Sequence, residues 1–103
     1  MDFKDKRVLV TGASRGIGFE IAKSFLDAGA RVAINGSSDA SVAAAMEKLS
    51  DYEHTVAAPG NLGTVSGCED SVQTAIDAFG GLDILVNNAF IIPNELTSGK
   101  NFW

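Results

Sequence analysis

The feature that most constrains this chain is a glycine-punctuated stretch near its start. Residues 7–11 contain a short apolar run, and Gly12, Gly16 and Gly18 follow it with the spacing G-x-x-x-G-x-G. A helical pattern begins at the second of these glycines, so the stretch predicts a buried strand, a turn and a helix N-terminus. The free N–H groups and the dipole of a helix N-terminus favour an anion, which predicts a phosphate-binding turn.

Each glycine has a physical role in that prediction. Gly12 allows a sharp turn with positive φ, Gly16 leaves no side chain between backbone and phosphate, and Gly18 lets the helix lie close to the first strand. The first gap is one residue longer than in the G-x-G-x-x-G fingerprint, and no Gly-Lys-Ser/Thr follows as in a Walker A loop. The alternative is an ordinary strand–helix turn with spare glycines, and a surrounding βαβ pattern favours phosphate binding.

The rest of the chain alternates strands with helices. Further strands are predicted over residues 30–35, 54–58 and 82–87, and helices over residues 16–28 and 39–49. A third helix follows the S-x-x-E capping box at Ser66 and ends at Phe79, before Gly80 and Gly81. Gly29 suits a left-handed helix end, and Ser38 suits an N-cap.

This order fixes the fold class. A βαβαβαβ order with short connections requires parallel strands and right-handed crossovers. We therefore predict an α/β fold, a Rossmann-like three-layer αβα arrangement with the parallel sheet order 3-2-1-4. Apolar spacing places two helix stripes against the sheet. The first stripe is Ile17, Ile21, Ala22, Phe25 and Leu26, and that of the third helix is Cys68, Val72, Ile76 and Phe79.

Composition limits the possible partners. The 103 residues carry a net charge of −5 and include one cysteine, Cys68. An acidic chain without a basic stripe argues against nucleic-acid binding, and a lone cysteine gives no sign of an oxidising compartment. No run approaches the length needed to span a bilayer, and the first residues lack a signal-peptide pattern. We expect a single-domain cytoplasmic protein that binds neither nucleic acid nor membrane.

Two motifs together resemble a known family. Residues 11–18, Thr-Gly-Ala-Ser-Arg-Gly-Ile-Gly, are similar to the TGxxxGxG motif of short-chain dehydrogenases/reductases, and Asn87-Asn88-Ala89 resembles their NNAG motif. The resemblance extends over about residues 3–92, and the whole segment is similar to 3-oxoacyl-carrier-protein-reductase-like members. It implies an NAD(P)-binding half-domain over residues 1–92, followed by an irregular tail over residues 93–103.

The resemblance also implies which residues contact the cofactor. The glycine turn would hold the pyrophosphate, the residues inside it and after the fourth strand would flank the adenosine ribose, and those after the third strand would lie near the adenine. The pyrophosphate residues are Gly12, Gly16, Ile17 and Gly18. The residues beside the ribose are Ser14, Arg15, Asn88 and Ala89, and those near the adenine are Asn61 and Leu62.

The cofactor expected from the resemblance is NADP rather than NAD. A basic residue at the Arg15 position accompanies NADP in the family, and a guanidinium can pair with a 2′-phosphate in fork geometry. Asn35-Gly36-Ser37-Ser38 ends the second strand without the carboxylate typical of NAD binders, and Ser37 and Ser38 could donate hydrogen bonds to the phosphate. The alternative is that these serines only cap the second helix.

Two departures from the family pattern affect the expected activity. Phe90 stands where the motif has glycine, so a large ring lies beside the expected nucleotide site. Family members are more than twice as long, and their catalytic Ser and Tyr-x-x-x-Lys pair have no counterpart here. The only tyrosine, Tyr52, is followed by Val56 instead of lysine. We assign no catalytic and no metal-binding residue, and interpret His54, Asp83 and Cys68 as structural.

The chain therefore looks truncated after its fourth strand. We expect the NADP(H)-binding part of an oxidoreductase that transfers a hydride between NADP(H) and a carbonyl or alcohol, inactive by itself. The alternatives are a non-catalytic dinucleotide-binding module, or an interaction protein. Residues 84–86 would form an apolar edge strand, and such edges favour self-association or pairing with a partner chain.

Overall fold

The computed structural model describes residues 3–61 and 63–88 of the chain. Strands and helices alternate through this part, as the sequence predicts, and most bounds agree within one or two residues. The elements are β1 (Arg7–Val10), α1 (Gly16–Asp27), β2 (Arg31–Ile34), α2 (Asp39–Lys48), β3 (Thr55–Ala57), α3 (Val65–Phe79) and β4 (Ile84–Val86).

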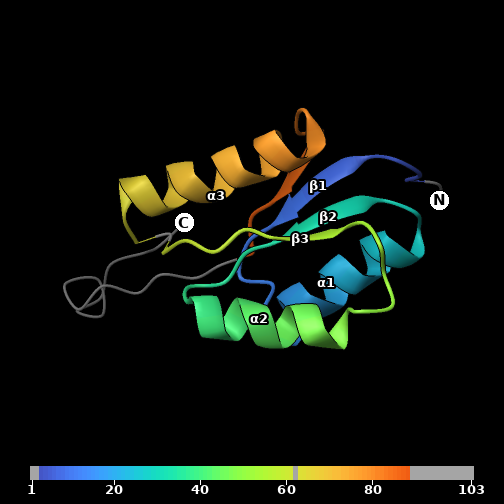
Figure 1. Cartoon of the computed structure of the whole chain (residues 1–103), viewed down its shortest axis with the longest axis horizontal. Helices are drawn as coiled ribbons and strands as arrows, with labels where there is room; N and C mark the ends of the chain where they lie inside the picture. The colour runs from blue at the N-terminus through green and yellow to red at the C-terminus, as the bar shows by residue number, and fades with distance from the viewer. Residues whose placement is uncertain (1–2, 62, 89–103) are drawn as a thin grey trace, which may run out of the picture.

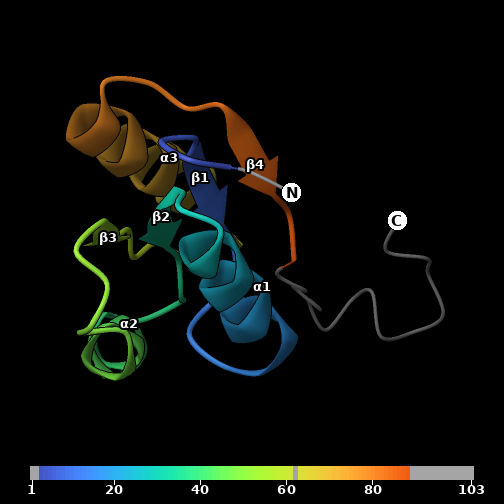
Figure 2. The same ribbon diagram turned by 90° about the vertical axis from the view of Figure 1, so that its right-hand side faces the viewer.

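The strands form one parallel sheet in the order β3-β2-β1-β4. Helices α1 and α2 lie on one face of the sheet and α3 lies on the other, so three layers are visible from the side (Figures 1 and 2). The predicted fold class and strand order are confirmed. Because β1 is central and all four strands are parallel, the loops after the strands meet at one edge, and the glycine turn lies in the middle of that edge.

The sheet divides the apolar core into two parts because side chains alternate along each strand. Val8 and Val10 of β1 pack on the side of α1 and α2, while Leu9 packs on the side of α3. The α3 side has fewer buried apolar residues. Leu85 of β4, which pairs with Leu9 in register, is 53% exposed.

The helix ends follow the local sequence at three of four predicted positions. Gly29, just after α1, has φ +92°, and Gly80 ends α3 in a left-handed conformation. Ser38 caps α2, since its side-chain oxygen accepts from Ser41 N at 3.2 Å. The predicted cap of the third helix is wrong. The N-cap is Thr64, whose hydroxyl accepts from Gly67 N at 3.0 Å, so the helix begins at Val65, before the expected Ser66 box.

Two of the predicted apolar faces also need correction. The deepest residues of α3 are Gly67, Ser71 and Ala75, one position before the predicted stripe, which is only half-buried. Small residues lie at the centre because α3 packs closely on the loop after β3, where a Cβ on Gly67 would lie 2.0 Å from Asn61 O. In α1, Ile17 is 75% exposed instead of buried, because the buried face of the helix follows Gly18, Ala22 and Leu26, one position further along the chain.

Several predictions concern residues outside the described part of the chain. These are Leu62, Ala89, Phe90 and the tail, so the proposed boundary between residues 92 and 93 stays a prediction. In residues 3–61 and 63–88, no helix is long and apolar enough to cross a bilayer. Within the same residues, no group of three or more His, Cys, Asp or Glu side chains is arranged to hold a metal ion.

Candidate dinucleotide-binding site

Segments that follow all four strands meet at the carboxyl edge of the sheet and are joined there by hydrogen bonds. Ala13 N donates to Asn35 O at 2.7 Å, and Gly60 N donates to Gly36 O at 3.1 Å. On the other side, Asn88 N donates to Thr11 Oγ1 at 2.8 Å. The predicted cofactor residues of the described part therefore lie along one edge, with the glycine turn at its centre.

The turn between β1 and α1 has the backbone that the glycine spacing predicts. Gly12 has φ +61° and Gly16 has φ +64°, a conformation that L side chains rarely adopt. A Cβ built on Gly16 meets nothing within 4 Å, so the space in front of this residue is open. At the start of α1, the N-cap Arg15 makes no side-chain cap and the first turn has no acidic residue. The helix N-terminus therefore keeps its favourable dipole for an anion.

Gly18 is required by a close approach inside the turn. A Cβ at this position would lie 2.1 Å from Gly12 O and 2.5 Å from Asn88 Nδ2. Asn88 Nδ2 itself donates to Gly12 O at 3.3 Å. The predicted closeness of helix and first strand is thus present, and its most sensitive contact is the carbonyl of Gly12. The side-chain amide of Asn88 is thus used to hold the turn. The predicted contact of Asn88 with the ribose stays a prediction.

An open groove of about 680 Å³ begins at Arg15, Gly16 and Ile17 and extends along the outer side of α1 to Lys48. Lys48 Nζ lies 5.8 Å from the ring centroid of Phe19, which forms part of the same groove. Only the first three residues belong to the predicted site. The predicted phosphate position is the helix start, so most of this largely apolar groove lies outside the predicted site.

The β2–α2 loop is packed against the glycine turn. A Cβ on Gly36 would lie 3.0 Å from Ser14 Cβ and 2.9 Å from Val42 Cγ2, so this position has no room for a side chain. Ser37 and Ser38 are exposed beside it. Ser38 caps α2, which matches the alternative stated for it above and leaves its role toward a phosphate a prediction.

The loop after β3 is held by its own hydrogen bonds. Asn61 Oδ1 accepts from Gly63 N at 2.8 Å, and Asn61 O accepts from Thr64 Oγ1 at 3.0 Å. These bonds fix the turn that leads into α3. The side chain is exposed at the site edge, and its contact with an adenine stays a prediction.

Asn35 is the important residue that the sequence analysis did not assign to the site. It is 1% exposed at the end of β2, and its Oδ1 accepts from Gly12 N at 3.1 Å. Its side-chain amide contacts the loop after β3 as well. The available signal was a polar residue closing an otherwise apolar strand, but only the structure reveals which groups it joins.

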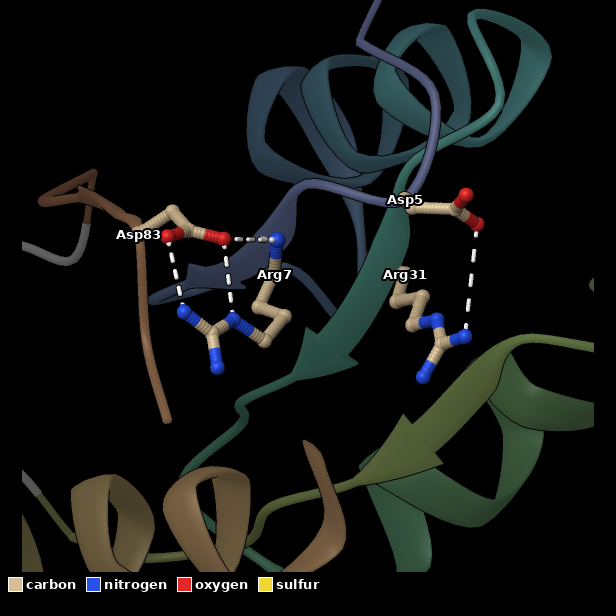
Figure 3. A network of polar contacts seen from close by, with 4 residues as sticks. All are labelled: Asp5, Arg7, Arg31 and Asp83. Carbon is tan, nitrogen blue, oxygen red and sulfur yellow. Dashed lines mark hydrogen bonds and ion pairs between the residues drawn. The ribbon is translucent and has the colours of Figure 1, made fainter. Parts of the chain in front are cut away.

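Asp83, interpreted above as structural, and Tyr52, given no catalytic role, lie away from this edge. At the starts of β1 and β4, Arg7 and Asp83 form a two-point ion pair, with Nε to Oδ2 and Nη2 to Oδ1 both 2.9 Å (Figure 3). The hydrogen bonds from Arg7 hold the pKa of Asp83 well below its usual range. Tyr52 donates its hydroxyl to Asp27 at the end of α1, and this bond raises the pKa of the phenol. Asp83 and Tyr52 therefore stabilise the opposite end of the sheet.

Comparison with known proteins agrees with this geometry. The family model described as short chain dehydrogenase matches residues 6–101, which is nearly the whole chain. The chain belongs to the short-chain dehydrogenase family. Peroxisomal multifunctional enzyme A of Dictyostelium discoideum is 40% identical over 109 residues, covering 97% of this chain and 24% of that protein. The 3-oxoacyl-[acyl-carrier-protein] reductase FabG of Vibrio harveyi is 40% identical over 96 residues, covering 93% of this chain and 38% of its own length.

A solved short-chain dehydrogenase fold superposes closely on the chain. The Pseudomonas aeruginosa RhlG/NADP active-site complex gives a TM-score of 0.82 at 37% identity, covering 94% of this chain and 39% of that one. The expected resemblance to 3-oxoacyl-carrier-protein reductases is confirmed. The chain spans between 24% and 39% of the length of these relatives, and it corresponds to their N-terminal, NAD(P)-binding portion.

Proposed function

We propose that the chain binds NADP(H) at the carboxyl edge of its sheet, with the pyrophosphate at the glycine turn. The observation that carries this proposal is the geometry of the turn. Gly16 has φ +64° and open space in front of it, next to a helix N-terminus without a side-chain cap. Such a site offers backbone N–H donors at close range to a doubly charged group.

Two observations support NADP over NAD. Arg15 is exposed at the rim of the turn, where its guanidinium can meet a 2′-phosphate. Residues 35–38, after β2, contain no carboxylate that would hold the ribose hydroxyls of NAD, and Gly36 has no room for a side chain. The similar RhlG structure contains NADP, which agrees with this choice.

The test is calorimetric titration of the chain with NADPH and NADH. We expect NADPH to bind more tightly, and Arg15→Ala to weaken NADPH about tenfold while leaving NADH unchanged, because one charge-assisted contact is lost. Arg31→Ala is the control, since Arg31 is a partly exposed arginine at the far end of β2. No binding at millimolar NADPH, or tighter binding of NADH, would contradict the proposal.

For the longer protein of which this would be the cofactor-binding part, we propose hydride transfer between NADP(H) and a carbonyl or alcohol. The support is membership of an oxidoreductase family. The chain has no Tyr-x-x-x-Lys pair, so we expect it to show no turnover alone. Detectable oxidation of NADPH by the purified chain with a carbonyl substrate would overturn this. The cytoplasmic location expected from the sequence stays a prediction.

We also propose that β4 pairs with a strand of another chain. In the purified protein, that other chain is a second copy of this one. Within the described residues β4 is an edge strand, and Leu85 on it is 53% exposed. Unpaired backbone groups beside an apolar side chain favour such pairing. We expect a dimer in analytical ultracentrifugation and a monomer for Leu85→Lys. A wild-type chain that sediments as a monomer would remove this proposal.

A further inference from the structure

The buried polar residues of the described chain are gathered at the carboxyl edge of the sheet. They are Thr11, Asn35 and Ser71, which are 5%, 1% and 0% exposed. A buried polar group destabilises the fold unless its hydrogen bonds are made, whereas a fully bonded network fixes one geometry. This network therefore determines the relative positions of the segments that it joins.

Asn35 holds the glycine turn on one side. Its Oδ1 accepts from Gly12 N at 3.1 Å, and its carbonyl oxygen accepts from Ala13 N at 2.7 Å. Two successive amides at the start of the turn are therefore bound to β2. They orient the turn so that the N–H groups of the first turn of α1, before Phe19, point away from β2 and remain for a ligand.

The amide nitrogen of the same side chain holds the opposite loop. Asn35 Nδ2 donates to Ala58 O at 3.1 Å, to Gly60 O at 3.2 Å and to Ser71 Oγ at 2.8 Å. Ser71 on α3 in turn donates to Ala58 O at 2.8 Å. Space is tight here, because a Cβ on Gly60 would lie 2.6 Å from Ser71 Oγ. One side chain thus spans from the turn after β1 to the loop after β3.

We propose that Asn35, supported by Ser71, is the positioning residue that sets the distance between the two walls of the cofactor site. One wall is the glycine turn, and the other is the loop from Ala58 to Asn61. This inference rests on the proposed function, because it assigns to Asn35 a role in binding NADP(H) at that site. Asn35 does not contact the ligand itself. It acts through the backbone groups that it holds.

The experiment compares NADPH affinity and thermal stability in three variants of the chain. Asn35→Ala removes all the side-chain bonds, and Ser71→Ala removes only the support from α3. Leu49→Ala is the control, because Leu49 is 1% exposed in the core beside α2 and its truncation destabilises the fold away from the site. We expect NADPH affinity to fall at least tenfold in Asn35→Ala and about threefold in Ser71→Ala, and to stay within twofold of wild type in Leu49→Ala, all measured well below the melting temperatures.

A pH profile separates positioning from a general loss of stability. In Asn35→Asp the ionised carboxyl accepts from Gly12 N but cannot donate to the carbonyls of Ala58 and Gly60, whereas the protonated form can. The groups bonded to the Asn35 side chain are backbone amide and carbonyl groups and one hydroxyl, so none of them is charged. We expect the affinity deficit of this variant relative to wild type to shrink as the pH falls from 8 to 5.

The outcomes are distinguishable. If wild type does not bind NADPH, the proposed function fails and the role of Asn35 fails with it. If wild type binds, and a folded Asn35→Ala or Ser71→Ala chain binds equally well, only the positioning role is overturned. If Leu49→Ala loses as much affinity as Asn35→Ala, the effect is general instability and the inference is wrong. Should Asn35→Ala not fold, Ser71→Ala and the pH profile of Asn35→Asp decide.

Discussion

The two ends of the parallel sheet are built from different chemistry. At the carboxyl edge, neutral hydrogen bonds join Asn35 to Gly12 and Thr11 to Asn88, and Gly12 and Gly16 have positive φ. At the amino edge, charged side chains join the strands, with Arg7–Asp83 at 2.9 Å and Arg31–Asp5 at 4.0 Å (Figure 3). The carboxyl edge keeps N–H donors and open space for a ligand, while the charged side chains named at the amino edge pair with one another. The following substitutions test this division, from the largest expected effect to the smallest.

Gly18→Ala should have the largest effect, and on both stability and binding. The new Cβ would lie 2.1 Å from Gly12 O, a backbone atom that cannot yield without moving the turn. We expect a loss of about 3 kcal/mol in the free energy of unfolding, as for overpacked sites. Calorimetry should detect no NADPH binding. A folded variant with wild-type affinity would show that the turn is not the phosphate site.

Gly16→Ala and Gly80→Ala form a matched pair across the two ends. Both glycines have positive φ, +64° and +77°, and neither Cβ would meet an atom within 4 Å. Each substitution should therefore cost about 1 kcal/mol of stability from backbone strain. Only Gly16→Ala should also lower NADPH affinity, because Gly80 lies at the end of α3. Equal affinities in the two variants would remove the distinction between the ends.

Asp83→Asn should lower stability at neutral pH by a few degrees in melting temperature, without changing NADPH affinity. The pKa of Asp83 is lowered from its ordinary 3.8 by the hydrogen bonds from Arg7. A depressed folded-state pKa contributes stability that is present above about pH 4 and lost as the pH falls through the folded-state value. The difference in melting temperature between wild type and variant should therefore be largest at pH 7 and shrink progressively as the pH falls below 4. A constant difference down to pH 2 would contradict the ion pair.

Tyr52→Phe should have the smallest effect. It removes the hydrogen bond from the Tyr52 hydroxyl to Asp27 but keeps the ring against the α1 and α2 side of the core. We expect a decrease of a degree or two in melting temperature and an unchanged NADPH affinity. Measuring the melting temperature and the NADPH affinity in one preparation would show whether a change at the amino edge affects the cofactor site. A clear loss of affinity would reveal such a connection.

Local sequence signals predicted the elements more accurately than their faces. Ser38 and Gly80 act as caps where expected, because capping depends on neighbouring residues only. The buried face of α3 is centred on Ser71 rather than Val72, since the close approach of the helix to the loop after β3 outweighs hydrophobicity there. Ile17 fits the predicted apolar stripe of α1 but lies outside the buried face, which follows Gly18, Ala22 and Leu26.

The sequence by itself determined the alternation of strands and helices, the order of the sheet and the place of the glycine turn. These follow from short-range periodicity, glycine geometry and the handedness of crossovers. Only the tertiary structure decided that Asn35 joins Gly12 to Ala58 and Ser71, and that Arg7 meets Asp83. Those contacts join residues 23 to 76 positions apart, and no local pattern specifies them. They arise when parallel strands bring the ends of distant segments to the same edge of the sheet.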